Sequence, residues 1–333
     1  MALGPPPLTP PPPARSSAGR GGPRLRYTEP LSLSDRYTNF PRIDDRADWQ
    51  APIALYDEDR MVEAYAATTE IGLGLSGRYL PWYRMIEAEF LTRERAEVID
   101  ATAWLTIEAI PEEVGEGLES LIETAKAEFD NVAARFDYNH ESEVRLAIMA
   151  IESDAPWTAG RFGFCVKKAP YFKICIPNSL LGNEVELGRT LRHEYSHVVS
   201  GTLSNGLVPR WLDEAIAVVV EGGVGREPRR AFVLGRRPWL SPTDLALAFR
   251  QEGEADVWYA YQQAGLIGEY LAQTYGERTL GDLLRAFANN SVWTELMLVL
   301  RGKPPVAEAL DEAYHVSVEG LFAQALEWLR RDG

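Results

Sequence analysis

The most constraining feature of this chain is a run of five residues, His193-Glu194-Tyr195-Ser196-His197. In a helix, residues four apart lie on one face, so both imidazoles can reach the same metal ion. Glu194 follows the first histidine and can reach a water molecule on that metal. Two metal-binding histidines beside a carboxylate base form the core of a water-activating zinc hydrolase. The chain has only four histidines, so its composition disfavours a chance match to this pattern.

The residues around the motif predict the helix that this geometry requires. Asn183 is a candidate N-cap, followed by Glu184 and Glu186 in the first turn, where the helix dipole favours negative charge. The run Ser204-Asn205-Gly206 predicts the end of the helix. Apolar residues recur between these limits at mostly helical spacing: Val185, Leu187, Leu191, Tyr195 and Val198.

A catalytic zinc site needs a third protein ligand and an open position for water. Pro209 fits the start of a second helix, where its missing N–H costs nothing. Glu214 falls within the apolar stripe of that helix, where a carboxylate has to be paired or bound to a metal. We therefore predict Glu214 as the third ligand. The adjacent Asp213 is the alternative ligand, or else an acceptor for an imidazole N–H. The stripe consists of Trp211, Leu212, Ala215, Ile216 and Val219.

Other arrangements of zinc ligands do not fit the sequence. Leu203 stands where a metzincin would have its third histidine, and Ser200 replaces the glycine of that motif. An inverted H-x-x-E-H is absent, and so is the G-x-M-E-N signature of thermolysin-like aminopeptidases. The pattern therefore excludes the metzincin arrangement and gives no support for capture of a substrate N-terminus.

Two segments, His193–His197 and Pro209–Ala217, together resemble the peptidase MA-like domain. Its members are gluzincins distantly related to thermolysin, with a P-x-W-L-x-E-G-x-A segment after the H-E-x-x-H helix. Tyr261–Gly276 resembles the next helix of that family, and the apolar positions from Leu280 to Phe287 resemble its short amphipathic helix. The resemblance runs from about residue 107 to about residue 289. One departure is Ala215, where the family usually has glycine.

This resemblance implies a zinc metallopeptidase of gluzincin type, with one Zn²⁺ per chain held by His193, His197 and Glu214. Glu194 would act as the general base and return the proton to the leaving amine. A tyrosine or histidine from the C-terminal helical part would stabilise the oxyanion. Tyr261 is the first candidate.

Tyr259 and His315 are the alternatives for the oxyanion donor. For a tyrosine in an apolar helix, packing in the core is the competing interpretation. The second hypothesis for the whole chain is an inactive zincin-fold protein that binds zinc or a peptide partner as a structural or regulatory module.

The order of elements predicts an α+β, zincin-like fold: a small mixed sheet with the active-site helix, followed by a helical C-terminal subdomain. Residues 103–110 and 144–151 read as strands, with a long amphipathic helix from Pro111 to Phe136 between them. Residues 162–166 and 171–176 read as a hairpin around Pro170. We expect its edge to lie beside the cleft and to pair with an extended peptide. Residues 306–329 read as an amphipathic helical segment.

Three regions follow from composition and pattern. Residues 1–48 are rich in proline and glycine without periodicity, and are predicted to be a disordered tail. Residues 49–100 are predicted to be an N-terminal extension that packs on the catalytic domain. Within it, 57–75 suggests a helix and 79–91 is undecided. Residues 101–333 are predicted to be the zincin-like metallopeptidase domain.

The charge and the remaining residues limit partners and compartment. A net charge of −15 opposes binding to nucleic acids and to anionic membranes. The resemblance to metallopeptidases implies a peptide or protein substrate as the partner. The sequence shows no signal peptide and no membrane-spanning run, so the cytoplasm is expected, or export if the start is misplaced. Cys165 and Cys175 are predicted to face each other across the hairpin as free thiols. His140 is predicted to lie exposed in a loop.

Overall fold

The computed structural model describes residues 47–71, 80–150, 163–167, 171–249, 254–289 and 305–332. The predicted tail, residues 1–48, lies outside the described residues except for its last two, which begin the first helix. Among the described helices, none combines the length and the apolar composition that crossing a membrane requires.

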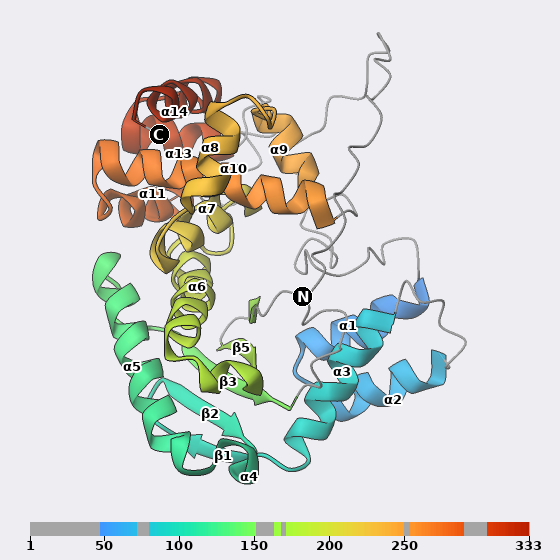
Figure 1. The fold of residues 1–333 in the computed structure, drawn as a ribbon. Coiled ribbons are helices and arrows are strands. Elements are labelled where there is room, and N and C mark those ends of the chain that lie inside the picture. The colour runs from blue at the N-terminus through green and yellow to red at the C-terminus, as the bar shows by residue number, and fades with distance from the viewer. Residues whose placement is uncertain are drawn as a thin grey trace, which may run out of the picture.

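A five-stranded mixed sheet forms the base of the fold (Figure 1). Its strands are β1 (Glu97–Asp100), β2 (Leu105–Ala109), β3 (Glu143–Met149), β4 (Phe164–Lys167) and β5 (Tyr171–Pro177), in the order β1-β2-β3-β5-β4. The three inner strands are parallel, and both outer strands pair antiparallel. The predicted strands and the hairpin are therefore present.

Strand β1 was not predicted, because it is short and mostly exposed, so its sequence has no apolar pattern to detect. It lies on the N-terminal side of the predicted domain boundary at residue 101 and nevertheless pairs with β2.

Helices cover both faces of the sheet. On one face lie α5 (Leu118–Arg135) and α6 (Glu184–Leu203), whose apolar side chains join those of the inner strands in one core. The helix predicted from Pro111 to Phe136 is interrupted. The chain forms α4 (Pro111–Val114) and a short 3-10 helix before α5, because Gly115 adopts a φ of +55°.

The other face of the sheet is covered by α1 (Ala47–Asp57), α2 (Met61–Ile71) and α3 (Leu80–Arg93) (Figure 1). Part of the predicted helix over 57–75 is α2, and residues 72–75 lie outside the described residues. The undecided stretch 79–91 is helical in α3 over its described part. This helix buries Glu89 and Thr92 together with Met85 and Ile86, so polar residues interrupt the apolar period that would have revealed it.

The C-terminal part is helical, as predicted, and α7 and α10 are its central pair. Gly265 and Gly268 of α10 allow the two helices to approach closely. A Cβ atom at these positions would lie 2.4 Å from Val218 Cγ1 and 2.5 Å from the Ala215 carbonyl oxygen, respectively. The helices are α7 (Arg210–Glu221), α8 (Arg226–Val233), α9 (Pro242–Ala248), α10 (Glu254–Tyr275), α11 (Thr279–Ala288), α13 (Pro305–Tyr314) and α14 (Val318–Asp332).

The predicted segment 306–329 is two helices, separated by a turn in which His315 has a φ of +54°. With these differences of detail, the α+β fold with a small mixed sheet, an active-site helix and a helical C-terminal part is confirmed.

The predicted contact between Cys165 and Cys175 is wrong. Cys175 lies opposite Phe164 in the β4–β5 pair, and Cys165 lies opposite Ile174. Because neighbouring residues of a strand point to opposite faces, this register places the thiols on opposite sides of the sheet. Cys175 packs with α1–α3 and Cys165 packs against the core on the α6 side. Symmetry of the sequence about Pro170 does not set the register. The two cysteines do not form a disulfide with each other.

The prediction that His140 is an exposed loop residue is also wrong. Its ring stacks on Trp104, with centroids 3.8 Å apart and planes 5° from parallel. Its Nδ1 lies 2.5 Å from the Tyr195 hydroxyl, and its Nε2 lies 2.9 Å from Asp130 Oδ1. Tyr195 belongs to the histidine motif of α6, so His140 supports that helix from the side opposite the two motif histidines.

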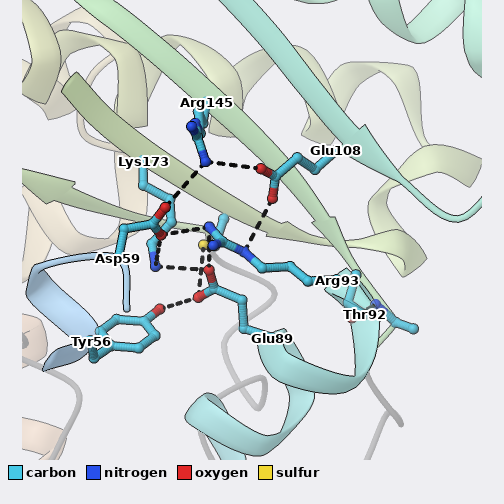
Figure 2. Close-up of polar contacts among 10 residues, drawn as sticks. Tyr56, Asp59, Glu89, Thr92, Arg93, Glu108, Arg145 and Lys173 are labelled. Atoms are coloured by element: carbon cyan, nitrogen blue, oxygen red, sulfur yellow. Dashed lines mark hydrogen bonds and ion pairs between the residues drawn. The ribbon is translucent and has the colours of Figure 1, made fainter. Parts of the chain in front are cut away.

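A cluster of charged side chains joins α1–α3 to the sheet (Figure 2). Three acidic and three basic residues take part, and they come from the turn after α1, from α3 and from the inner strands. They are Asp59, Glu89, Arg93, Glu108, Arg145 and Lys173. Because the charges balance, each buried ion has a partner of opposite sign, which offsets part of the cost of removing it from water.

Glu89 is the centre of this cluster and is fully buried. Lys173 Nζ lies 2.8 Å and Arg93 Nη2 lies 3.0 Å from its Oε1 atom. Its Oε2 atom accepts hydrogen bonds from the Tyr56 hydroxyl and the Cys175 thiol (Figure 2). Burial, and then the charge of Glu89, raise the pKa of the Cys175 thiol, so this thiol stays protonated and unreactive.

Replacing Lys173 by methionine should destabilise the protein by about 3–5 kcal/mol, because Glu89 would remain buried without that partner. Urea unfolding followed by circular dichroism measures the change. Arg60→Gln is the control, since the Arg60–Glu63 pair is exposed on both sides and should leave the midpoint unchanged. Equal midpoints for Lys173→Met and wild type would contradict a stabilising role for the cluster.

Candidate metal centre

Helix α6 places the two histidines of the motif on one face, as predicted. The Asn183 side chain accepts a hydrogen bond from the Glu186 backbone N–H at 3.2 Å, so the predicted N-cap is confirmed. The rings of His193 and His197 have centroids 5.0 Å apart and planes at 82°. His197 is 7% exposed, so the pair lies in the interior with only His193 partly accessible.

Helix α7 brings Glu214 to the same point. Its Oε2 atom lies 3.5 Å from His193 Nε2 and 3.6 Å from His197 Nε2. One ligand atom from each of the three residues can be chosen so that all lie within 4.8 Å of one another. Ligand atoms bound at tetrahedral zinc distances lie about 3.4 Å apart. The separations between the carboxylate oxygen and the imidazole nitrogens therefore match those of a bound zinc ion.

The Oε2 atom of Glu214 supplies the test of whether a metal fits. This oxygen is buried, and no hydrogen-bond donor satisfies it within the described part of the chain. A buried carboxylate oxygen without a donor is costly unless a cation compensates it. Two imidazoles and one carboxylate are also a donor set that zinc prefers. The residues present thus fit a zinc ion at this position.

Each histidine has a carboxylate behind it, and both carboxylates come from α7. His193 Nδ1 shares a hydrogen bond with Glu221 Oε2 at 3.1 Å, and His197 Nδ1 lies 3.1 Å from Asp213 Oδ2, at ion-pair distance but without hydrogen-bond geometry. Asp213 also accepts a hydrogen bond from the Ser200 hydroxyl. Such contacts orient an imidazole and increase its basicity toward a metal. The sequence indicated Asp213 for this role but missed Glu221.

The spacing between Glu214 and Glu221 in the sequence could have indicated the role of Glu221. It stands seven residues after Glu214, two turns along the same face of a helix. On that face of α7 lie Arg210, Asp213, Glu214 and Glu221, so one helix supplies both the third candidate ligand and the groups that orient the first two.

The second oxygen of Glu214 is held by two further groups. Arg210 Nη2 lies 3.4 Å from Oε1, and the Tyr261 hydroxyl of α10 donates to the same atom at 3.2 Å. The structure therefore brings Tyr261 to the candidate metal centre. Tyr259, two residues earlier, instead lies under the guanidinium of Arg237.

The other alternative for the oxyanion donor, His315, is exposed in the turn between α13 and α14. Of the three candidates named from the sequence, Tyr261 is thus the one that contacts a member of the metal group.

The charges at the site favour binding of a cation. Burial alone would raise the pKa of Glu214, but the charge of His197, the adjacent His193 imidazole and the charge of Arg210 lower it to about 2. Burial opposes a charge on His193, yet its contacts with Glu214 and Glu221 raise its pKa well above the usual value. In the metal-free protein a proton on His193 therefore compensates the carboxylates, so protons and a metal compete for this position.

Glu194 lies beside the three candidate ligands, and β4 packs against the Glu194 side chain. The side chain is 4% exposed, and burial raises its pKa. Gly163 immediately precedes β4, the last strand in the sheet order. A Cβ atom on Gly163 would lie 3.1 Å from Glu194 Cγ and 2.9 Å from both the Cys175 carbonyl oxygen and Ile176 Cγ2. The edge of the sheet can pass this close to Glu194 because residue 163 has no side chain.

Substituting Gly163 by alanine should destabilise the protein by about 1–3 kcal/mol, because the new methyl group meets atoms that are already in contact. Gly182→Ala is a matched control, since a Cβ atom there has no neighbour within 4 Å. The control should change stability by about 0.5 kcal/mol or less. Unfolding in urea measures both, and equal stabilities for the two variants would show that Gly163 is not tightly packed.

Part of this chain matches the model of a known protein family. Residues 172–321 match the model of the peptidase MA superfamily. Comparison with curated proteins and with solved structures gave no match. The matched region runs from β5 through α6, α7 and α10 to α14, and so contains all three residues of the candidate metal centre. The resemblance predicted from the motif and from the Pro209–Ala217 segment is confirmed, because residues 172–321 match the model of the peptidase MA superfamily.

Proposed function

We propose that this protein is a zinc-dependent metallopeptidase of gluzincin type, in which His193, His197 and Glu214 hold one Zn²⁺. The observation that carries the proposal is the Oε2 atom of Glu214. It is buried, has no hydrogen-bond donor among the residues that the structure describes, and lies within 3.6 Å of Nε2 of both histidines. The match to the peptidase MA superfamily supports the same class of activity.

The chemistry divides between the metal and the side chains. A zinc ion at this position would act as a Lewis acid that polarises the peptide carbonyl and makes a water molecule acidic near neutral pH. Glu194 would accept a proton from the attacking water and return it to the leaving amine. Its raised pKa suits this exchange, because a base works best when its pKa approaches the working pH.

Tyr261 is the proposed donor to the oxyanion that forms on the attacked carbonyl. Its hydroxyl donates to the carboxylate of Glu214, and in the proposed step it would exchange this acceptor for the reacting oxygen. The Glu214 carboxylate keeps a hydrogen-bonding partner during this exchange, since Arg210 contacts the same oxygen.

The substrate is proposed to be a peptide or an extended segment of a protein. Strand β4 ends the sheet, and its outer edge has no neighbouring strand among the described residues. A peptide pairing there would run beside Glu194, because Gly163 at the start of this edge packs on that side chain.

Purified protein should contain about one zinc per chain by elemental analysis. His197→Ala and Glu214→Ala should each lose it, because two remaining ligands hold zinc weakly. His315→Ala is the matched control, since His315 lies exposed in a distant part of the sequence and should leave the zinc content unchanged. A wild-type protein without zinc would refute the proposed centre.

Wild-type protein should cleave members of a peptide library, and Glu194→Gln should bind zinc but not cleave, because it lacks the base. Zinc binding by wild type without any cleavage would instead favour the second hypothesis, a zincin-fold protein that binds zinc or a peptide without turnover.

Asp213→Asn should weaken zinc binding by about 10- to 100-fold, because the amide orients His197 less well and does not increase its basicity. Competition with a fluorescent chelator measures the affinity. An unchanged affinity would show that the contact between Asp213 and His197 has no effect on the metal.

Tyr261→Phe should lower kcat by about 10²- to 10³-fold while leaving the zinc affinity unchanged, as expected for loss of an oxyanion donor. The opposite result, weaker zinc binding with normal kcat at saturating zinc, would limit Tyr261 to holding Glu214. Tyr259→Phe is the control and should change neither quantity.

A further inference from the structure

One segment of this acidic protein is strongly basic. Residues 226–237 contain five arginines and one glutamate, a net charge of +4, so the rest of the chain carries −19 (−15 minus +4). The segment comprises α8 and the turn that follows it. Arg229 is committed to the fold, because it pairs with Glu269 and lies over the ring of Trp328.

The other four arginines form what we call the arginine surface, and all four are exposed: Arg226, Arg230, Arg236 and Arg237. Arg226 and Arg230 are four residues apart on α8 and therefore share a face of that helix. None of the four forms an ion pair with a carboxylate in the part of the chain that the structure describes. Four guanidinium groups are thus available to a partner.

The fold holds this surface in place. Phe232 packs edge-on against Trp239, with centroids 5.7 Å apart, which folds the turn back onto α8. The Gln263 side chain accepts from the Leu240 N–H at 2.8 Å and donates to its carbonyl oxygen at 2.9 Å. Arg237 stacks on Tyr259, with its Cζ atom 3.4 Å from the ring centroid. A guanidinium held flat on an aromatic ring loses little entropy when it binds a carboxylate.

The arginine surface lies close to the candidate metal centre along α10. Tyr259, under Arg237, is two residues from Tyr261, whose hydroxyl donates to Glu214. Residues two apart point to nearly opposite sides of a helix, so the surface and the metal centre are separated by the width of α10, about 10 Å. A peptide of a few residues spans this distance.

Exposed apolar side chains accompany the charges. Leu234, between the two pairs of arginines, and Trp258, next to Tyr259, are each 50% exposed. A partner that carries both carboxylates and apolar side chains would contact the whole surface.

We propose that the arginine surface binds an acidic segment of a protein partner and, resting on the proposed function, that this segment belongs to the substrate. Arginine forms paired hydrogen bonds with carboxylates, so clustered Asp and Glu side chains complement this surface. A membrane or a nucleic acid is an extended polyanion. It would also come close to the rest of this chain, whose net charge of −19 would repel it. A short acidic segment contacts the basic region alone.

The test uses a fluorescent peptide rich in Asp and Glu, and a matched peptide with Asn and Gln in their place. Binding is measured by anisotropy on full-length Glu194→Gln protein, so that no cleavage intervenes. The acidic peptide should bind at least tenfold more tightly than the amide peptide. Adding Arg236→Gln/Arg237→Gln should weaken its binding about fivefold, and Arg226→Gln/Arg230→Gln should have a similar effect. Raising the salt concentration should weaken it further.

Arg60→Gln/Arg84→Gln is the control, because it removes the same charge from exposed positions in the N-terminal helices and should leave binding unchanged. Equal affinities for the acidic and amide peptides, or no effect of the arginine variants, would overturn the proposal. So would arginine-dependent binding to phosphatidylserine vesicles or to single-stranded DNA that is tighter than to the acidic peptide, or an arginine-dependent dimer in sedimentation. Cleavage by the wild-type protein is measured in a separate experiment. If the acidic peptide binds but no peptide is cleaved, the proposed activity is refuted, and the proposal that the arginine surface binds acidic segments stands.

Discussion

The packing of α7 against α6 brings an excess of negative charge into the protein interior. Asp213, Glu214 and Glu221 of α7 meet the histidines of α6, beside Glu194. Arg210 contacts Glu214 and Arg189 contacts Glu221, so arginines compensate two of the four carboxylates. Buried like charges repel strongly, so this helix pair is stable only when protons or a cation compensate them. Folding of the pair would therefore be coupled to binding of the proposed metal.

The buried cluster between α1–α3 and the sheet differs from the site on α6 and α7 in its charges. It contains three acidic and three basic residues, and its ions compensate one another (Figure 2). That cluster needs no ligand and ties the N-terminal helices to the strands. At the site on α6 and α7, four carboxylates (Glu194, Asp213, Glu214 and Glu221) lie near two arginines, Arg189 and Arg210, so the acidic and basic side chains do not balance. The balance of charge, more than the number of ionisable residues, separates a structural network from a binding site in this molecule.

Close packing on three sides fixes the geometry of the two helices. Gly265 and Gly268 let α10 approach α7 closely enough for Tyr261 to reach Glu214. Behind α6, the Tyr195 ring stacks on Phe129 with centroids 4.2 Å apart, and its hydroxyl meets His140. Beside Glu194, the glycine at position 163 admits the edge of the sheet. At each of these positions, the size or the polar group of the residue makes the contact possible.

The sequence by itself determined the local features of this protein. The spacing of His193 and His197, the cap at Asn183 and the apolar stripe around Glu214 depend on helix periodicity, which acts over a few residues. The same reasoning identified the inner strands and the order of elements that makes the fold α+β.

Tertiary structure decided what depends on contacts between distant segments. It set the register that separates Cys165 from Cys175, stacked His140 on Trp104, and placed Glu221 behind His193. It also formed α3, whose buried Glu89 is compensated by Lys173 from a strand 84 residues away. No local pattern encodes such pairs, because the partner that stabilises each residue is chosen by the packing of the whole chain.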